Sequence, residues 1–86
     1  MFTLRDAVFV ANELGVTFDH FSVQDLITGL NIELEHGYQN PITNITNNDL
    51  LLTAKIVLAH LKEFPNYYNS IYGIKTFEDY LRSKLK

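Results

Sequence analysis

Two histidines of this chain each have a glutamate three positions away on a stretch with helical character. Glu33 and Glu35 come just before His36, whereas His60 comes before Glu63. Residues three apart on a helix project from nearly the same side, about 60° apart around its axis. If the two helices pack antiparallel, the two reversed pairs meet and can surround one metal ion. The candidate metal site is therefore Glu33, His36, His60 and Glu63, with Glu35 as the alternative to Glu33.

Imidazole and carboxylate ligands together suit zinc, iron or manganese. Helical bundles that hold two metal ions use two Glu-x-x-His pairs and a glutamate from each of two further helices. This chain departs from that pattern, because its second pair is reversed and Glu13 faces away from the apolar stripe of its own helix. A site for a single ion is the form that we expect.

A structural role for the same residues stays open. His36 stands before Gly37 and can stabilise a helix end, while His60 can bond to Glu63 at the edge of the core. If the two pairs face each other, they form either a metal site or a polar network. His20 lies in a connector, where we expect it to be exposed.

Catalytic motifs are scarce in this chain. It has no cysteine and no glycine-rich phosphate loop, and its three serines, Ser22, Ser70 and Ser83, read as caps or surface residues. We therefore expect a protein that is not an enzyme. A metalloenzyme with an open coordination position is a third alternative, and it needs a pocket that a chain of 86 residues can barely provide.

Helical spacing of apolar residues and capping signals predict the elements that position these side chains. Thr3 with Asp6 and Ser22 with Asp25 resemble capping boxes. The expected helices are residues 4–14, 23–36, 49–64, a short aromatic helix through residues 67–72, and 77–85 after a Thr76 and Asp79 signal.

The fold class expected from this pattern is all-α: a single small bundle of four to five helices forming one domain over residues 1–86. Helix 49–64 is apolar nearly all round, so we expect it to be the central element. Gly29 inside helix 23–36 indicates that a neighbouring helix approaches closely there. Residues 38–48 are rich in asparagine and threonine and predict an ordered polar loop that sets how the second and third helices pair.

Charge and hydropathy limit the partners. The net charge of −3 offers no basic footprint for nucleic acid, and no apolar run is long enough to span a membrane. Without a visible signal peptide, a cytoplasmic location is expected.

Residues 1–49 carry seven acidic side chains and one basic, whereas residues 50–86 carry six basic and three acidic. This asymmetry favours attraction between the two halves of one fold, and the alternative is contact between copies of the chain.

Three stretches resemble a domain-of-unknown-function family of small proteins. They are the run from Gly29 to Gly37 containing Glu-Leu-Glu-His-Gly, the loop from Thr43 to Asp49, and the run from Lys55 to Tyr68 reading Lys-Ile-x-Leu-Ala-His-Leu-x-Glu-x-Pro-x-Tyr-Tyr. The resemblance covers about half of the chain. It implies that Glu35, His36, Lys55, His60, Glu63, Pro65 and Tyr68 belong to one signature.

Members of that family occur in bacteria, phages and large DNA viruses, and the resemblance implies no established activity. The function that we expect is a small helical module that acts through protein contacts or self-association. If the source is viral, the resemblance further implies that the protein is an accessory or virion component and is located in the virion. The alternative is a small metal-binding helical bundle with the Glu/His site described above.

Overall fold

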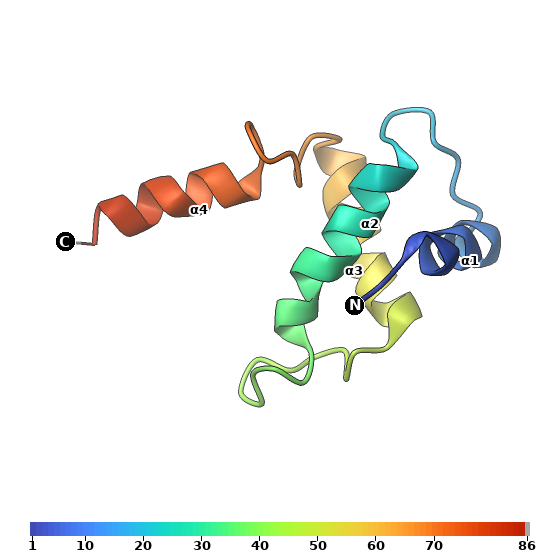
Figure 1. The fold of residues 1–86 in the computed structure, drawn as a ribbon, viewed down its shortest axis with the longest axis horizontal. Coiled ribbons are helices and arrows are strands. Elements are labelled where there is room, and N and C mark those ends of the chain that lie inside the picture. The colour runs from blue at the N-terminus through green and yellow to red at the C-terminus, as the bar shows by residue number, and fades with distance from the viewer. Residues whose placement is uncertain (86) are drawn as a thin grey trace.

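The chain folds into four α-helices and one short 3-10 helix. The computed structural model describes residues 1–85, and its elements are α1 (Leu4–Leu14), α2 (Val23–Ile32), η1 (Glu33–His36), α3 (Leu50–Glu63) and α4 (Ile74–Ser83), arranged as Figure 1 shows. No strand is present in these residues, so the all-α prediction is confirmed. The first three helices form the packed body of the molecule, and η1 continues α2 with a tighter turn.

Local side chains begin the first two helices as the sequence predicts. The Asp6 carboxylate accepts a hydrogen bond from the Thr3 backbone N–H at 2.8 Å. In α2, the Ser22 hydroxyl accepts from the Asp25 N–H at 3.1 Å, and the Asp25 carboxylate accepts from the Ser22 N–H at 2.9 Å. These bonds satisfy backbone donors that the first turn of a helix leaves unpaired.

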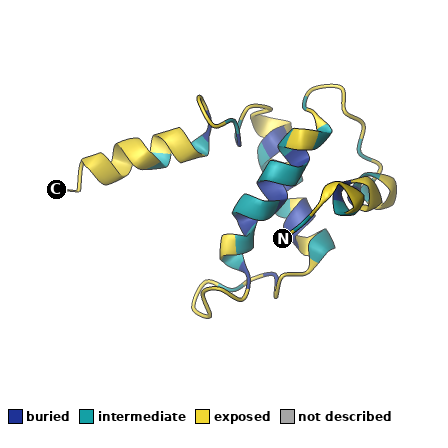
Figure 2. Ribbon diagram, in the orientation of Figure 1, coloured by how far each residue is buried: buried dark blue, intermediate teal, exposed yellow. Residues whose placement is uncertain are grey.

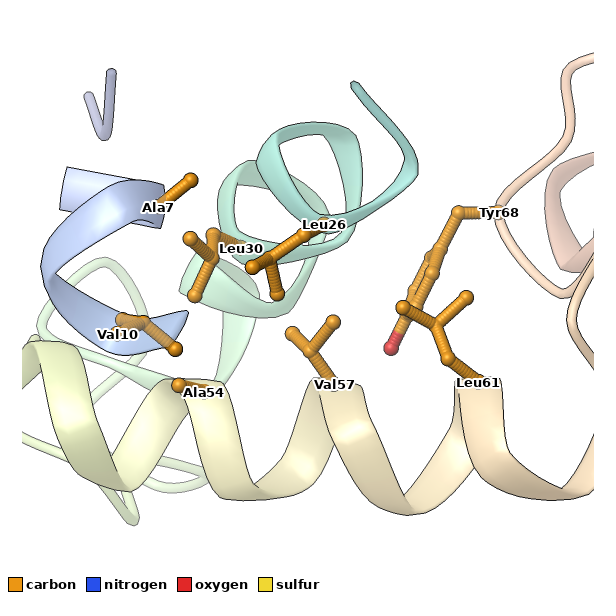
Figure 3. Packing of buried hydrophobic residues seen from close by; sticks show 8 residues of the cluster. All are labelled: Ala7, Val10, Leu26, Leu30, Ala54, Val57, Leu61 and Tyr68. Carbon is orange, nitrogen blue, oxygen red and sulfur yellow. The ribbon is translucent and has the colours of Figure 1, made fainter. Parts of the chain in front are cut away.

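The core lies between α1, α2 and α3. Figure 3 shows its eight buried apolar residues, with α1 contributing at one end and Tyr68 closing the other end. They are Ala7, Val10, Leu26, Leu30, Ala54, Val57, Leu61 and Tyr68. Gly29 lies where α2 meets this cluster, and a Cβ atom there would come within 2.6 Å of Val57 Cγ1 and 2.7 Å of Tyr68 Cε2. The close approach predicted at Gly29 is therefore present.

Helix α3 buries one face and leaves another in solvent. Thr53, Ala54, Val57 and Leu61 are buried, whereas Leu52 is 49% exposed. Figure 2 shows exposed and buried positions alternating around the helices of the body. The prediction that this helix is central and surrounded by others is not confirmed.

The loop of residues 38–48 returns to the end of η1. The Ile45 N–H donates to the His36 carbonyl oxygen at 2.6 Å, and the Tyr38 N–H donates to Asn48 Oδ1 at 2.8 Å. Thr46 is buried and accepts a hydrogen bond from the Asn48 N–H. The loop is therefore bonded to the segment that carries His36, as its asparagine and threonine content predicts.

The segment after α3 differs from our prediction. Residues 67–72 form turns rather than a short helix, because the Asn69 side-chain oxygen accepts from the Ile71 and Tyr72 N–H groups and so competes with helical bonding. Helix α4 begins at Ile74, earlier than predicted. The Thr76 hydroxyl donates to the Ser70 and Ile71 carbonyl oxygens instead of capping a helix.

Helix α4 projects from the body of the molecule, as Figure 1 shows. It packs against none of the other helices among the described residues, and Figure 2 shows that most of its surface is exposed. Only Ile74 in its first turn packs against the core. No described helix has both the length and the apolar character needed to cross a membrane.

Candidate functional site

The site is centred on Glu33, the first residue of η1. Leu26, Leu30 and Glu33 follow one another at helical spacing, so the glutamate continues the buried stripe of α2. Its exposed fraction is only 4%. A carboxylate in such a position is costly unless hydrogen-bond donors surround it. Every polar group that meets Glu33 is therefore part of the site.

Two donors, one from α3 and one from the turn after it, meet one oxygen of Glu33. The Tyr68 hydroxyl donates to Glu33 Oε2 at 2.5 Å, and His60 Nδ1 lies 3.0 Å from the same oxygen. His60 Nδ1 also lies 2.8 Å from the Tyr68 oxygen. Glu33, His60 and Tyr68 thus form a closed triangle that joins the end of α2 to α3 and to the turn after it.

The triangle determines which nitrogen of His60 carries a proton. The only hydroxyl hydrogen of Tyr68 is used by Glu33, so His60 Nδ1 can bond to the two oxygens only as a donor. In the neutral ring, Nε2 then carries the lone pair. The ring stacks on Tyr67 with centroids 4.2 Å apart and an interplanar angle of 11°, which fixes its plane.

The second oxygen of Glu33 faces His36. Glu33 Oε1 lies 3.6 Å from His36 Nε2, and Glu35 Oε1 lies 3.5 Å from the same nitrogen. One ligand atom from each of these three residues can be chosen so that all lie within 4.8 Å of one another. Glu33 therefore links two sets of partners, one through each carboxylate oxygen.

These separations resemble those between ligands of a metal ion. Ligand atoms at about 2.0 to 2.1 Å from a tetrahedral ion lie about 3.3 Å apart. The distances of 3.5 and 3.6 Å to His36 Nε2 are close to that spacing, and they exceed an ordinary N–H···O hydrogen bond. Two of the three separations within the Glu33, Glu35 and His36 group are therefore already near the spacing of ligand atoms.

The surroundings favour a positive charge. Burial raises the pKa of the Tyr67 phenol, and the negative charges of Glu33, Glu78, Glu35 and Glu63 act in the same direction. Burial is also the largest cause that raises the pKa of the Tyr68 phenol. Its hydrogen bond to Glu33 and the negative charge of Glu33 raise that pKa further. Both phenols thus keep their protons in a region of negative potential, to which a cation would be attracted.

A pocket of about 350 Å³ opens beside these residues. Its walls come from η1, α3, the turn after α3 and the start of α4, and include Glu33, Glu35, His36, His60 and Glu78. The side chains of His36 and His60 are 37% and 34% exposed, and that of Glu35 is 50% exposed. An ion can therefore reach the three candidate ligand atoms from solvent.

The structure brings three of the four predicted site residues together. Glu33, His36 and His60 meet, and Glu35, the alternative to Glu33, joins them. Glu63 is exposed at the end of α3 and lies outside the pocket. Its negative charge is the smallest of the influences that raise the pKa of Tyr67.

Sequence reasoning did not place Tyr68 and Tyr67 in the site. It assigned Tyr68 to the family signature and to the short aromatic helix expected over residues 67–72. The signal that was available is that a buried tyrosine hydroxyl needs a partner, and a buried glutamate can provide one. The turn that begins at Pro65 returns both tyrosines to His60.

Residues 7–76 match the model of a protein family described as "Protein of unknown function (DUF5661)". The matched range contains Glu33, Glu35, His36, His60 and Tyr68, whereas most of α4 lies beyond it. No curated protein and no solved structure matches the chain. The family resemblance expected from the sequence is thus confirmed.

Proposed function

Because this chain belongs to the DUF5661 family and its Glu/His site lies within the matched residues, we propose that it is a small metal-binding helical module. Glu33, Glu35 and His36 supply the ligands for a single divalent ion. The observation that carries this proposal is the convergence of their three ligand atoms within 4.8 Å beside a buried carboxylate.

His60 and Tyr68 have a different role in this proposal. Both bond to Glu33 Oε2 and leave Oε1 directed toward His36. Hydrogen bonds to a ligating carboxylate orient it and are a regular part of metal sites. His60 and Tyr68 therefore position Glu33 rather than contacting the ion through the atoms that form the triangle.

The donor set limits the class of ion. Two carboxylates and one imidazole suit zinc, manganese or ferrous iron, and the absence of cysteine makes the site a poor one for softer ions. Water completes the coordination on the side of the pocket. The role that we propose for this module is metal binding without catalysis.

The test is calorimetric titration of protein stripped of metal, with zinc and with manganese in separate experiments. We expect one ion per chain for wild type and at least a tenfold weaker affinity for Glu35→Gln. This side chain is half exposed, so its replacement removes a ligand with little effect on folding. His36→Gln should weaken binding to a similar degree.

Glu63→Gln is the matched control, because it removes one acidic charge nearby without touching the pocket. If Glu63→Gln weakens binding as strongly as Glu35→Gln does, the metal affinity is due to general electrostatic attraction and not to coordination at the proposed site. Wild type that takes up neither ion at neutral pH rules out the proposal directly.

A second candidate function is a module that acts through protein contacts. The observation that favours it is the exposed apolar surface of α4, where Phe77 and Leu81 are 56% and 48% exposed. A helix with such a stripe and no neighbouring helix is typical of a docking element. This function and metal binding involve different parts of the molecule, so both can be true of one chain.

A further inference from the structure

Helix α4 turns one acidic residue toward the body of the molecule. Ile74 and Glu78 are partly buried, whereas every other residue of Ile74–Ser83 is exposed. The two residues are four positions apart, so they lie on the same side of the helix. Because Ile74 packs against the core, Glu78 also faces the body. Packing alone would favour the opposite arrangement, since Phe77 and Leu81 of the same helix are 56% and 48% exposed.

Glu78 lies beside the candidate metal site. It lines the pocket of about 350 Å³ whose walls also contain Glu33, Glu35, His36 and His60. Glu35 and Glu78 line a second pocket of about 360 Å³ as well. Because both pockets have these two residues in their walls, the Glu35 side chain from η1 and the Glu78 side chain from α4 border the same space.

The charge of Glu78 is not balanced by a basic side chain in the first pocket. The ion pair of Arg82 with Asp79 at 2.9 Å is the only lysine or arginine ion pair within residues 1–85. Lys75 and Arg82 line the second pocket, but neither of them lines the first. The first pocket therefore has three carboxylates and two imidazoles, with no lysine or arginine. Such a set of side chains attracts a divalent cation.

Tyr67 ties the start of α4 to the site. The Ile74 N–H donates to the Tyr67 carbonyl oxygen at 2.6 Å, and the Tyr67 ring stacks on His60 with centroids 4.2 Å apart. Burial is the largest cause that raises the pKa of the Tyr67 phenol, and among the charges that raise it further, that of Glu78 follows that of Glu33. The first turn of α4 is therefore held next to the imidazole of His60, with Glu78 one turn further along.

We propose that Glu78 is a fourth protein ligand of the ion, so that the ion joins α4 to the body of the molecule. This inference rests on the metal site proposed above, and Glu78 takes a position that was assigned there to water. Three carboxylates and one imidazole form a set of four ligands that suits zinc or manganese.

Glu78 has to move toward the other ligands for this role. The ligand atoms of Glu33, Glu35 and His36 lie within 4.8 Å of one another, and Glu78 is not part of that group. Its carboxylate reaches the ion by rotation about the side-chain bonds and by a tilt of α4. Within residues 1–85, no other helix packs against α4 and opposes that tilt.

The ion should therefore restrain α4, which a site confined to η1 would not do. Without the ion, α4 packs against no other helix in the described residues, so its amide groups should exchange readily with solvent. An ion held by residues of both η1 and α4 removes this freedom. Exchange of the α4 amides should slow when metal binds, while exchange in the core helices changes little.

Calorimetric titration of the metal-free chain with zinc, together with hydrogen exchange measured by mass spectrometry, tests the inference. Loss of a residue that only orients a ligand weakens metal binding about 10- to 100-fold, so Glu78→Gln should bind zinc at least tenfold more weakly than wild type. Glu78→His supplies another zinc ligand and should recover most of that affinity. Zinc should slow exchange of the α4 amides at least about tenfold in wild type and in Glu78→His, but not in Glu78→Gln.

Glu63→Gln is the control for charge, because it removes an acidic side chain outside the pocket and should bind zinc as wild type does. Circular dichroism confirms that each variant is folded. A loss of affinity in Glu63→Gln equal to that in Glu78→Gln would overturn the inference, because charge alone would explain both. So would Glu78→His that binds no better than Glu78→Gln, or wild type whose α4 exchange is unchanged by zinc.

Failure of this inference can be distinguished from failure of the metal site itself. If wild type binds one ion and Glu35→Gln weakens binding while Glu78→Gln does not, the site stands with water in place of Glu78 and only this inference is overturned. If wild type binds no ion, the site and the role of Glu78 are overturned together.

Discussion

The Tyr68 hydroxyl and the Glu33 carboxylate are joined by a hydrogen bond of 2.5 Å although the residues are 35 positions apart in the chain. Glu33 is 4% exposed and Tyr68 is also 4% exposed, so the bond is formed away from water. It ties the turn after α3 to the end of α2. Because the same carboxylate faces His36 through its other oxygen, this bond connects the packing of the core to the geometry of the candidate metal site.

Replacing Tyr68 by phenylalanine should lower the free energy of unfolding by about 1 to 3 kcal/mol, because it leaves a buried carboxylate with one donor fewer. Urea unfolding followed by circular dichroism measures the change. Tyr72→Phe is the control, since Tyr72 is 76% exposed and its loss of a hydroxyl should be almost neutral. Equal effects of the two substitutions would show that the bond to Glu33 contributes nothing measurable.

Stability should fall at alkaline pH through the same tyrosine. Burial, the hydrogen bond to Glu33 and the charge of Glu33 raise the pKa of Tyr68 above its ordinary value of 10.0. The folded state therefore holds the proton more tightly than the unfolded state does. The stabilisation is complete below pH 10 and is lost as pH rises above it.

Urea unfolding at a series of pH values around and above 10 measures this loss. Tyr68→Phe should show a shallower decline than wild type, and Tyr67→Phe should also flatten it, because the pKa of Tyr67 is raised as well. If the free energy of unfolding of wild type and that of Tyr68→Phe decline in parallel as pH rises, ionisation of Tyr68 is not the cause of the decline.

Local signals in the sequence sufficed to predict most of the helices. The pairs Thr3 with Asp6 and Ser22 with Asp25 begin α1 and α2 where predicted, and Gly15 ends α1 with a φ of 67°. Such signals act between neighbours in the chain, so they can be read without the fold. The predicted start of α4 was wrong because the Thr76 hydroxyl bonds to carbonyl oxygens of the preceding turn. This contact depends on the path of that turn.

Only part of the site could be predicted for a related reason. The spacing of Glu33 and His36 depends on one helix and is visible in the sequence. The meeting of His60 with Glu33 followed from the assumption that the two helices pack antiparallel. Tyr68 could not be placed because it follows a turn whose geometry the sequence pattern does not specify, and Glu63 projects into solvent because α3 buries only one face.

Gly29→Ala should destabilise the fold by about 1 to 3 kcal/mol even though alanine favours a helix by about 1 kcal/mol. The new methyl group would lie 2.6 Å from Val57 Cγ1 and 2.7 Å from Tyr68 Cε2, so α2 must move away from both. Urea unfolding measures the loss, and Gln24→Ala on the exposed side of α2 is the control. A stabilised Gly29→Ala would mean that α2 can shift without cost.

Replacing each of the two histidines by alanine should separate a metal ligand from a residue that orients one. In the proposed site His36 contacts the ion, whereas His60 bonds to the oxygen of Glu33 that faces away from it. His36→Ala should abolish stoichiometric binding and change the stability of metal-free protein little. His60→Ala should weaken binding about 10- to 100-fold and also destabilise metal-free protein by about 1 to 3 kcal/mol.

Thermal melting with and without a strong chelator, together with metal analysis of protein purified without added metal, measures both effects. An ion present at a hundred times its Kd adds about 2.7 kcal/mol to the free energy of unfolding. Chelator should therefore lower the melting temperature of wild type and leave that of His36→Ala unchanged. His20→Ala, in an exposed connector, is the control and should behave as wild type.

The two substitutions also distinguish the metal site from a purely structural network. If Glu33, His60 and Tyr68 only hold the fold together, wild type contains no stoichiometric metal and chelator changes nothing, while His60→Ala still destabilises the protein. Binding also requires that the imidazole nitrogen be unprotonated, so the effect of chelator on wild type should shrink as the solution is made acidic. A chelator effect that persists equally in His36→Ala would assign the ion to other residues, because His36 Nε2 is the atom that both carboxylates of the candidate site approach.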